Sequence, residues 1–445
     1  MFTTWSDSGQ NGSGDLGQSG GDDNTQTGSI GPQDTFKNPE RLPALDLFSD
    51  EISHAGISFT TTVGSTAQHV NTSGFPGYWQ ALSNFGAGVS IAKEGPNYGL
   101  VMTYDGGLSL TSGGSNYSYS QLNQTATGHL TWNFAKHWQF RLRDTYLYSD
   151  DPFQPFFTFL GTTTPNNPNP VTYFPNTVLE QNQGHADLTY QLSPHDIINF
   201  TGDEAFTRYL RQQVTSFYNS VEYAGGVFYQ HSFSARLASG GGYQFAGLDF
   251  GHGQSRAGTQ TFEGFIQYVF SSKLTASLWI GPEVTNTKDI VPVFCYQFGC
   301  FVQVFHQTSL SVAEGGQLSW RPTRRDGLNV QVSRGVSNAG GFLGAAHIYQ
   351  ILGTYGRPIN RVWSLGIGAS YNDSTSVSDF RASQYLRSVN GTVGVSRKLF
   401  NDAWTMNAYY AFIDQKQNYF GAPITIATSG FGFTVRYTWD HGLGR

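Results

Sequence analysis

The chain has little charge, little sulfur and no long apolar run. Only 13% of its 445 residues are charged, and it contains two cysteines and three methionines. The sequence has no basic patch of the kind that nucleic-acid binding requires, so that class of function is excluded. No segment approaches the roughly 18 consecutive apolar residues that a membrane-spanning helix needs. A chain of this composition that crosses a bilayer must therefore cross it with strands.

The amino-terminal segment lacks the pattern of a secretory signal, because Met1 is followed at once by a hydrophilic stretch. We expect that a signal has been removed. Residues 1–53 are predicted to be an acidic, mostly disordered periplasmic tail, since Gly, Ser, Asp, Asn and Gln cannot bury enough apolar surface to order a segment. Within it, residues 31–52 carry apolar side chains between prolines, and we expect this part to contact the barrel or a periplasmic partner.

Alternating side chains are what the chain has in abundance. In the segment from Phe431 to Trp439, large apolar residues occupy every second position, and glycine, threonine and an arginine stand between them. A strand has a side-chain period of two, so one face of this strand is apolar and aromatic and the other is polar. With aromatics at 15% and 54 glycines, the composition is typical of a wall with one apolar and one wet face.

The same pattern predicts a single closed antiparallel transmembrane β-barrel over residues 54–445. We expect eighteen strands, with ends uncertain by about 2 to 4 residues. Their predicted ranges are 55–68, 79–92, 97–110, 117–134, 138–149, 178–192, 197–209, 213–230, 235–249, 257–271, 273–288, 304–321, 326–337, 346–356, 361–373, 383–399, 403–416 and 426–440.

The connections predict how the barrel is oriented. Short turns follow even-numbered strands, as at 135–137 and 193–196, and we assign them to the periplasmic rim. Longer connections follow odd-numbered strands and are expected on the outer rim: 150–177, 289–303, 338–345 and 374–382. Aromatic residues flank the short turns, where rings with one polar end settle at a membrane interface. A soluble β-sandwich with aromatic core strands is the alternative, but sandwiches do not sort long and short connections in this way.

Side-chain parity predicts the lumen wall. In 117–134, threonine, asparagine and His129 share one face, and in 361–373 serine, glycine and asparagine do so. The wall is therefore expected to be small, hydroxylated and nearly uncharged, with a modest cationic component from a few residues. These lumen candidates are His129, Arg141, Arg143, Lys398 and Arg436. Asp144 and Glu314 fall on the apolar parity, which calls for a β-bulge or a position above the lipid.

The longest connection, 150–177, is the third outer loop and carries an aromatic cluster. Such a loop in a compact domain is functional or disordered, and exposed aromatic clusters mark interaction sites. One hypothesis is that the loop folds into the lumen and narrows it. The alternative is that it packs on the outer rim or on a neighbouring subunit. The constriction candidates are Asp150, Asp151, Phe153, Phe156, Phe157 and Phe159.

The two cysteines, Cys295 and Cys300, share one predicted outer loop. In an oxidising envelope a small disulfide is expected, because a metal site needs more ligands than this segment offers. The eleven histidines show no zinc-type spacing, and no nucleophile motif is present. The sequence therefore predicts no metal site, no cofactor and no enzyme.

With these strands, turns and aromatic positions, residues 55–440 resemble the bacterial outer-membrane β-barrel superfamily, without pointing to one family in it. The segment from Phe431 to Trp439 is similar to the terminal strand that the barrel assembly machinery recognises, although residues 441–445 follow it. Eighteen strands look like sugar-specific porins and alginate-type polysaccharide exporters. The resemblance implies an outer-membrane location, lipid contact and association with further copies of the chain.

These observations predict a porin-like channel for passive diffusion of small polar solutes, with sugars as one class. Two alternatives stay open at this point. One is an exit conduit for an exopolysaccharide, which predicts a periplasmic partner for residues 31–52. The other is a structural or adhesive barrel with a blocked lumen.

Overall fold

The computed structural model describes most of the chain beyond the amino-terminal tail. The described residues are 55–74, 76–112, 120–149, 178–211, 219–251, 253–296, 299–323, 325–338, 344–378, 384–399, 403–419 and 422–443. Every regular element within these ranges is a β-strand. No helix in this part of the chain is long and apolar enough to cross a bilayer.

The eighteen expected strands are all present, which confirms the predicted fold class. Their bounds are β1 Ala55–Thr72, β2 Tyr78–Gly95, β3 Tyr98–Ser112, β4 Ser120–Ala135, β5 Trp138–Ser149, β6 Val178–Gln191, β7 Asp196–Arg211, β8 Ser220–Ser232, β9 Leu237–Phe250, β10 Ser255–Ser271, β11 Leu274–Tyr296, β12 Gly299–Trp320, β13 Gly327–Ser337, β14 Ala346–Pro358, β15 Trp363–Ser376, β16 Tyr385–Leu399, β17 Trp404–Tyr419 and β18 Ala422–Leu443.

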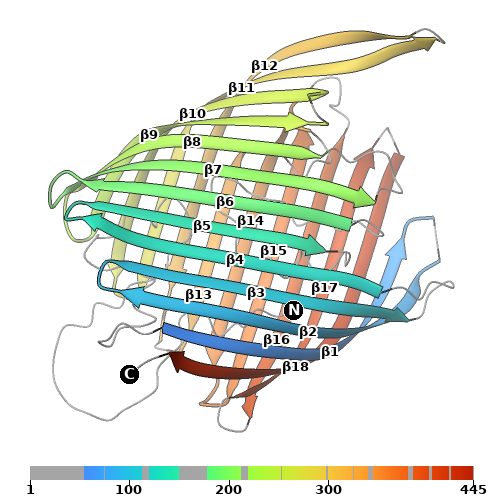
Figure 1. The fold of residues 1–445 in the computed structure, drawn as a ribbon. Helices are drawn as coiled ribbons and strands as arrows, with labels where there is room; N and C mark the ends of the chain where they lie inside the picture. Colours follow the sequence, from blue (N-terminus) through green and yellow to red (C-terminus); the bar gives the residue numbers. More distant parts are fainter. Residues whose placement is uncertain are drawn as a thin grey trace.

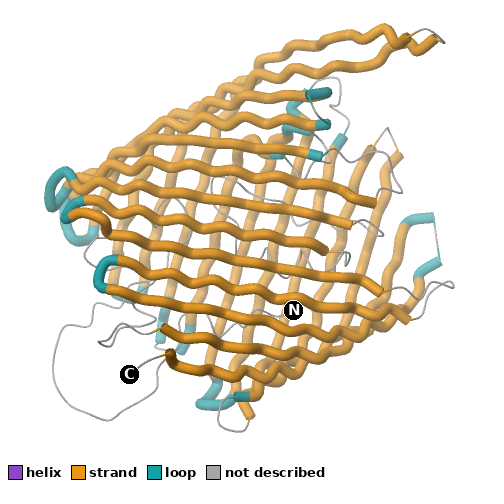
Figure 2. The backbone as a smooth tube through the Cα atoms, viewed as in Figure 1, coloured by secondary structure: helices purple, strands orange, loops and turns teal. Residues whose placement is uncertain are grey.

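The sheet closes on itself between its first and last strands (Figures 1 and 2). β1 pairs with β18 antiparallel from Ala55↔Leu443 to Thr72↔Ile426, and with β2 on its other side. Every strand therefore has a neighbour on each side and the ring is closed, although β12 pairs with β13 only from Glu314 to Trp320. Because eighteen is even, the start of β1 and the end of β18 lie on the same rim.

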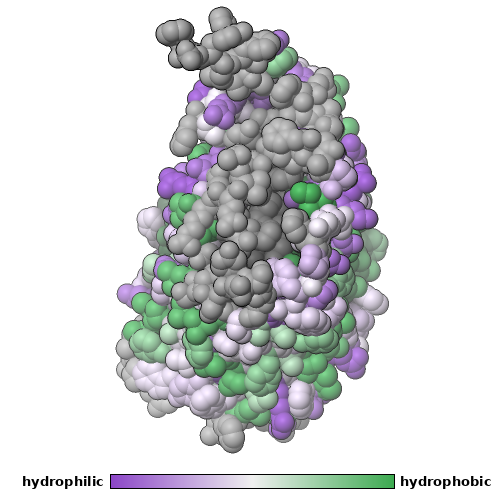
Figure 3. Space-filling model, turned by 90° about the vertical axis from the view of Figure 1, so that its right-hand side faces the viewer, coloured by the Kyte–Doolittle hydropathy of each residue, from purple (hydrophilic) through white to green (hydrophobic). Residues whose placement is uncertain are grey.

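Apolar side chains cover the outside of the barrel. On β18, Phe431, Phe433 and Trp439 are 63%, 43% and 45% exposed, whereas the alternate residues Thr428 and Thr434 are buried. The face in Figure 3 shows hydrophobic residues gathered in its lower half, with hydrophilic ones along its margins. Soluble monomers rarely expose so large an apolar surface, and a closed barrel with this exterior is the architecture of the bacterial outer membrane.

The parity predicted from the sequence is confirmed on the two strands that it used most. On β4, Asn123 and Thr131 are 5% exposed, whereas Trp132 is 48% exposed. On β15, Ser370 and Asn372 are buried, and Ile367 on the opposite parity is exposed. The inner wall thus carries hydroxyl and amide groups, as expected.

Aromatic rings gather at the rim of the short turns. The indole of Trp138 stacks on Tyr190 with ring centroids 4.4 Å apart, and on Phe134 at 6.0 Å. Farther around the rim, Trp404 and Tyr437 lie 4.8 Å apart. Amphipathic rings at this level mark the boundary between lipid and water.

The connections on the opposite rim differ from the prediction. The segment 289–303, expected as a loop, is strand almost throughout, because β11 and β12 pair as far as Tyr296↔Gly299. In Figure 1 this hairpin projects beyond its neighbours. β9 and β10, and also β17 and β18, are joined by short connections too. Alternating residues predict strand equally well inside and above the membrane, so the sequence could not separate the wall from its extensions.

Asp144 and Glu314 lie on the outer face without a bulge beside them. Asn182 donates a hydrogen bond to Asp144 at 2.9 Å. Arg334 pairs with Glu314 at 3.5 Å, and these two residues are the last pair of the β12–β13 ladder on that side. The bulge explanation is therefore wrong, and each carboxylate has a polar partner on the adjacent strand.

One turn on the rim of the short connections is held by a carboxylate. Asp196 accepts hydrogen bonds from His231 at 2.8 Å, Ser193 at 2.6 Å and Tyr229 at 2.5 Å. These bonds, the one from His231 above all, hold the pKa of the Asp196 carboxyl well below its usual value. Because this pKa is depressed in the folded state, the ionised carboxylate stabilises that state at pH values above its ordinary pKa of 3.8. The stabilisation is lost as the pH falls through the folded-state pKa.

The substitution Asp196→Asn should lower the thermal midpoint of the detergent-solubilised barrel at neutral pH. The difference from the unmodified chain should shrink as the pH falls below about 4, where the carboxylate takes up its proton. Circular dichroism melts at a series of pH values measure this. A difference that stays constant down to strongly acidic pH would contradict the role given to the charge.

Candidate functional site

The predicted cationic residues all lie on the inward parity of their strands. His129 is on β4, Arg141 and Arg143 on β5, Lys398 on β16 and Arg436 on β18. Arg141 is the most buried, at 4% exposure. The register places His129 opposite Arg143, and Thr131 opposite Arg141, so three of the five form one cluster on adjacent strands. Lys398 and Arg436 lie on the other side of the β1–β18 closure and do not join it.

Arg141 begins a line of ionic contacts that runs across the wall. Its Nε lies 3.8 Å from Oδ2 of Asp187 on β6, and the same oxygen lies 3.0 Å from Nε2 of His185. Nδ1 of His185 then lies 2.6 Å from Oδ1 of Asp203 on β7. The arrangement alternates sign along its length, so part of the cationic character expected from Arg141 is neutralised by Asp187.

Beyond Asp203 the wall becomes acidic. The inward carboxylates Glu222, Glu263 and Glu283 belong to β8, β10 and β11, and all three are buried. The described parts of β8 to β11 place no lysine or arginine on the inward parity. The interior is therefore divided by charge, with a basic sector at β4 and β5 and an acidic sector at β8 to β11.

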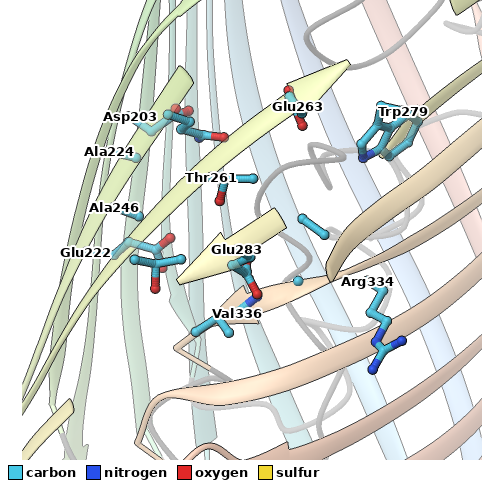
Figure 4. A pocket seen from close by; sticks show the side chains of 14 residues that line it. Asp203, Glu222, Ala224, Ala246, Thr261, Glu263, Trp279, Glu283, Arg334 and Val336 are labelled. Carbon is cyan, nitrogen blue, oxygen red and sulfur yellow. The ribbon is translucent and has the colours of Figure 1, made fainter. Parts of the chain in front are cut away.

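These carboxylates surround one cavity of about 40 Å³, together with Asp203 and Trp279 (Figure 4). Glu283 is anchored at its edge. Its Oε1 accepts a hydrogen bond from Ser311 at 2.7 Å, and its Oε2 accepts one from the backbone N–H of Val336 at 3.2 Å. Since the β12–β13 ladder ends at Glu314 and Arg334, this side chain satisfies a donor that lies beyond the ladder.

Aromatic rings form the side of the cavity that faces the rim of the short turns. Phe228, Phe265 and Trp279 make a buried cluster from β8, β10 and β11. Glycines on neighbouring strands leave room for the rings. A Cβ at Gly242 would come within 2.2 Å of Phe228, and one at Gly315 within 2.0 Å of Trp279. No larger residue fits there while the rings stay in place.

Apolar residues close the opposite side of the cavity. A buried cluster is formed by Leu248 and Phe250 of β9, Ala257 of β10, Val336 of β13, Ala345 just before β14 and Val377 just after β15. The acidic groups therefore lie between two apolar layers inside the barrel. Charges in such a low-dielectric setting interact more strongly than they would in open water.

The sequence reasoning missed the acidic sector. The signal was present, because Thr259, Thr261 and Glu263 share one parity and the exposed Phe262 and Ile266 share the other. The sequence could not show the register, which places residues from the seven consecutive strands β7 to β13 around one cavity. Asp203 lies opposite Ala224, and Thr261 lies opposite Glu283.

Two other predictions touch parts of the chain where little is described. The constriction candidates Asp150, Asp151, Phe153, Phe156, Phe157 and Phe159 lie outside the described residues, so the narrowing loop stays a prediction. Cys295 and Cys300 are direct register partners on β11 and β12. They belong to the projecting hairpin instead of a loop, and their disulfide stays a prediction.

No protein-family model and no curated protein matches the chain. Solved structures do resemble it. OpdL of Pseudomonas aeruginosa is 11% identical with a TM-score of 0.39, over 87% of this chain and 99% of that one. OccAB1 of Acinetobacter baumannii is 9% identical with a TM-score of 0.41, over 87% and 96%. The FrpB iron transporter of Neisseria meningitidis is 8% identical with a TM-score of 0.41, over 89% and 84%. The likeness is one of fold and carries no information on solute.

The register of the two cysteines predicts that they are joined. Alkylation of the unfolded protein with iodoacetamide should modify neither cysteine without a reductant and both after reduction. Mass spectrometry of the peptide that contains residues 295–300 measures this. Full alkylation before reduction would show that the pair is not bonded.

Removal of the Asp187 charge should destabilise the barrel, because the buried Arg141 would lose its counterion. We expect Asp187→Asn to cost about 3 to 5 kcal/mol of unfolding free energy. Asp144→Asn is the matched control, since this carboxylate is exposed on the adjacent strand and should cost little. Urea titrations of both variants in lipid vesicles measure the difference. Equal stability of the two variants would contradict the pairing.

Proposed function

We propose that the protein is a porin-like channel through which small polar solutes, sugars among them, cross the outer membrane by passive diffusion. The observation that carries this proposal is the closed ring of eighteen strands whose inward positions are polar and whose outward positions are apolar. Such a wall suits a water-lined passage, because most of its buried inward positions carry hydroxyl, amide or charged groups instead of apolar side chains.

The chemistry of the wall supports polar solutes. Hydroxyl and amide groups pair along it, as where Asn390 donates to Ser370 at 3.1 Å and Asn123 donates to Ser109 at 3.1 Å. These four side chains are buried, so they satisfy one another and keep the inward face polar without contacting a solute themselves. Selectivity would then arise from the width of the passage and from the charged sectors on its two sides.

Planar-bilayer recordings test the proposal. The purified chain should give stepwise single-channel currents without any added partner, and a maltooligosaccharide should reduce them while it occupies the lumen. Folding of the same sample is verified by circular dichroism. A folded barrel that gives no steps would overturn the proposal, and a channel that opens only with a periplasmic partner would favour an export conduit.

A further inference from the structure

Glu263 is a buried acidic residue whose carboxyl group has no partner among the described residues. The residue is 9% exposed, and no described side chain or backbone group bonds to its carboxylate. Burial of an unpaired carboxylate is costly, because the protein replaces none of the hydrogen bonds that water supplied. The side chain lines the acidic cavity together with Thr261 of the same strand (Figure 4).

The charged residues near Glu263 that have partners are paired with groups other than Glu263. Asp203 is paired with His185, and Glu283 is held by Ser311 and Val336. Arg334 is the one lysine or arginine among the described lining residues, but its guanidinium pairs with Glu314 on the outer face. A positive partner for the ionised form of Glu263 would therefore come from outside these residues.

Trp279 adds a second contribution to the same cavity. The indole is 8% exposed and lies among the residues that line the space. A tryptophan face attracts a cation through its quadrupole, most strongly when the cation is desolvated. The described residues contain no group of three or more acidic, histidine or cysteine side chains that could hold a metal ion. Carboxylates beside an indole instead fit an organic ammonium group.

We propose that this cavity is a binding site for a small organic cation, in which Glu263 supplies the counter-charge and Trp279 the aromatic face. The site deepens the proposed function, because it rests on solute reaching the lumen and assigns a cationic class to it. The two apolar layers beside the site exclude part of the water and strengthen the attraction.

Methylammonium is the probe, because a cation of two heavy atoms matches a cavity of about 40 Å³. Isothermal titration calorimetry of the detergent-solubilised full chain is the measurement. Methylammonium chloride should bind the unmodified protein, whereas sodium chloride at the same concentration should not. Glu263→Gln keeps the shape of the side chain and should weaken methylammonium binding by about tenfold or more. Glu204→Gln is the matched control, since Glu204 is next to Asp203 but faces outward and is exposed, and it should change the affinity less than about twofold.

Trp279→Phe is a second variant that keeps an aromatic ring, and it should weaken methylammonium binding by a few-fold. Circular dichroism verifies that each variant is folded. No heat of methylammonium binding to the folded unmodified chain, or equal affinity in Glu263→Gln, would overturn the site. Bilayer conductance separates this result from the proposed function: a channel that conducts but does not bind methylammonium refutes the site alone, and methylammonium binding without conductance refutes the channel alone.

Discussion

The structure depends on the requirement that every backbone polar group in a bilayer be bonded within the protein. A strand meets this requirement only if it has a partner on both sides, so the sheet must close, and the β1–β18 ladder is where it does. Once the ring is closed, the period of two leaves each residue only two environments. Phe431 and Phe433 lie on the outer, apolar face, and Thr434 and Arg436 lie on the inner, polar face.

Glycines make room for aromatic rings on the inner wall. Rings from adjacent strands lie against the sheet at Gly240, Gly242 and Gly315, where a side chain would clash with them. The aromatic layer that results lies between the acidic sector and the part of the wall near the short turns. The ionic line from Arg141 to Asp203 then joins the basic sector to the acidic one, so charge inside the barrel is ordered around the ring instead of being spread evenly.

The sequence was sufficient for the number of strands, their order and the face that each residue occupies, because alternation is a local property. It was insufficient where neighbours are distant in sequence. Glu222, Glu263 and Glu283 stand about 20 to 60 positions apart and meet only through the register of β8 to β11. It also could not show that β11 and β12 continue through residues 289–303, since an exposed hairpin obeys the same period as the wall.

The central claim is that lipid touches one face of this sheet and water the other, and accessibility along β18 tests it most directly. Single cysteines replace residues 433, 435, 436 and 438 in a chain in which serine replaces Cys295 and Cys300, and each variant is reconstituted in liposomes. A water-soluble maleimide should label positions 436 and 438, which face inward and are only partly buried, while a lipid-borne quencher should reach probes only at 433 and 435. Equal labelling at all four positions, or the reverse order, would contradict the account.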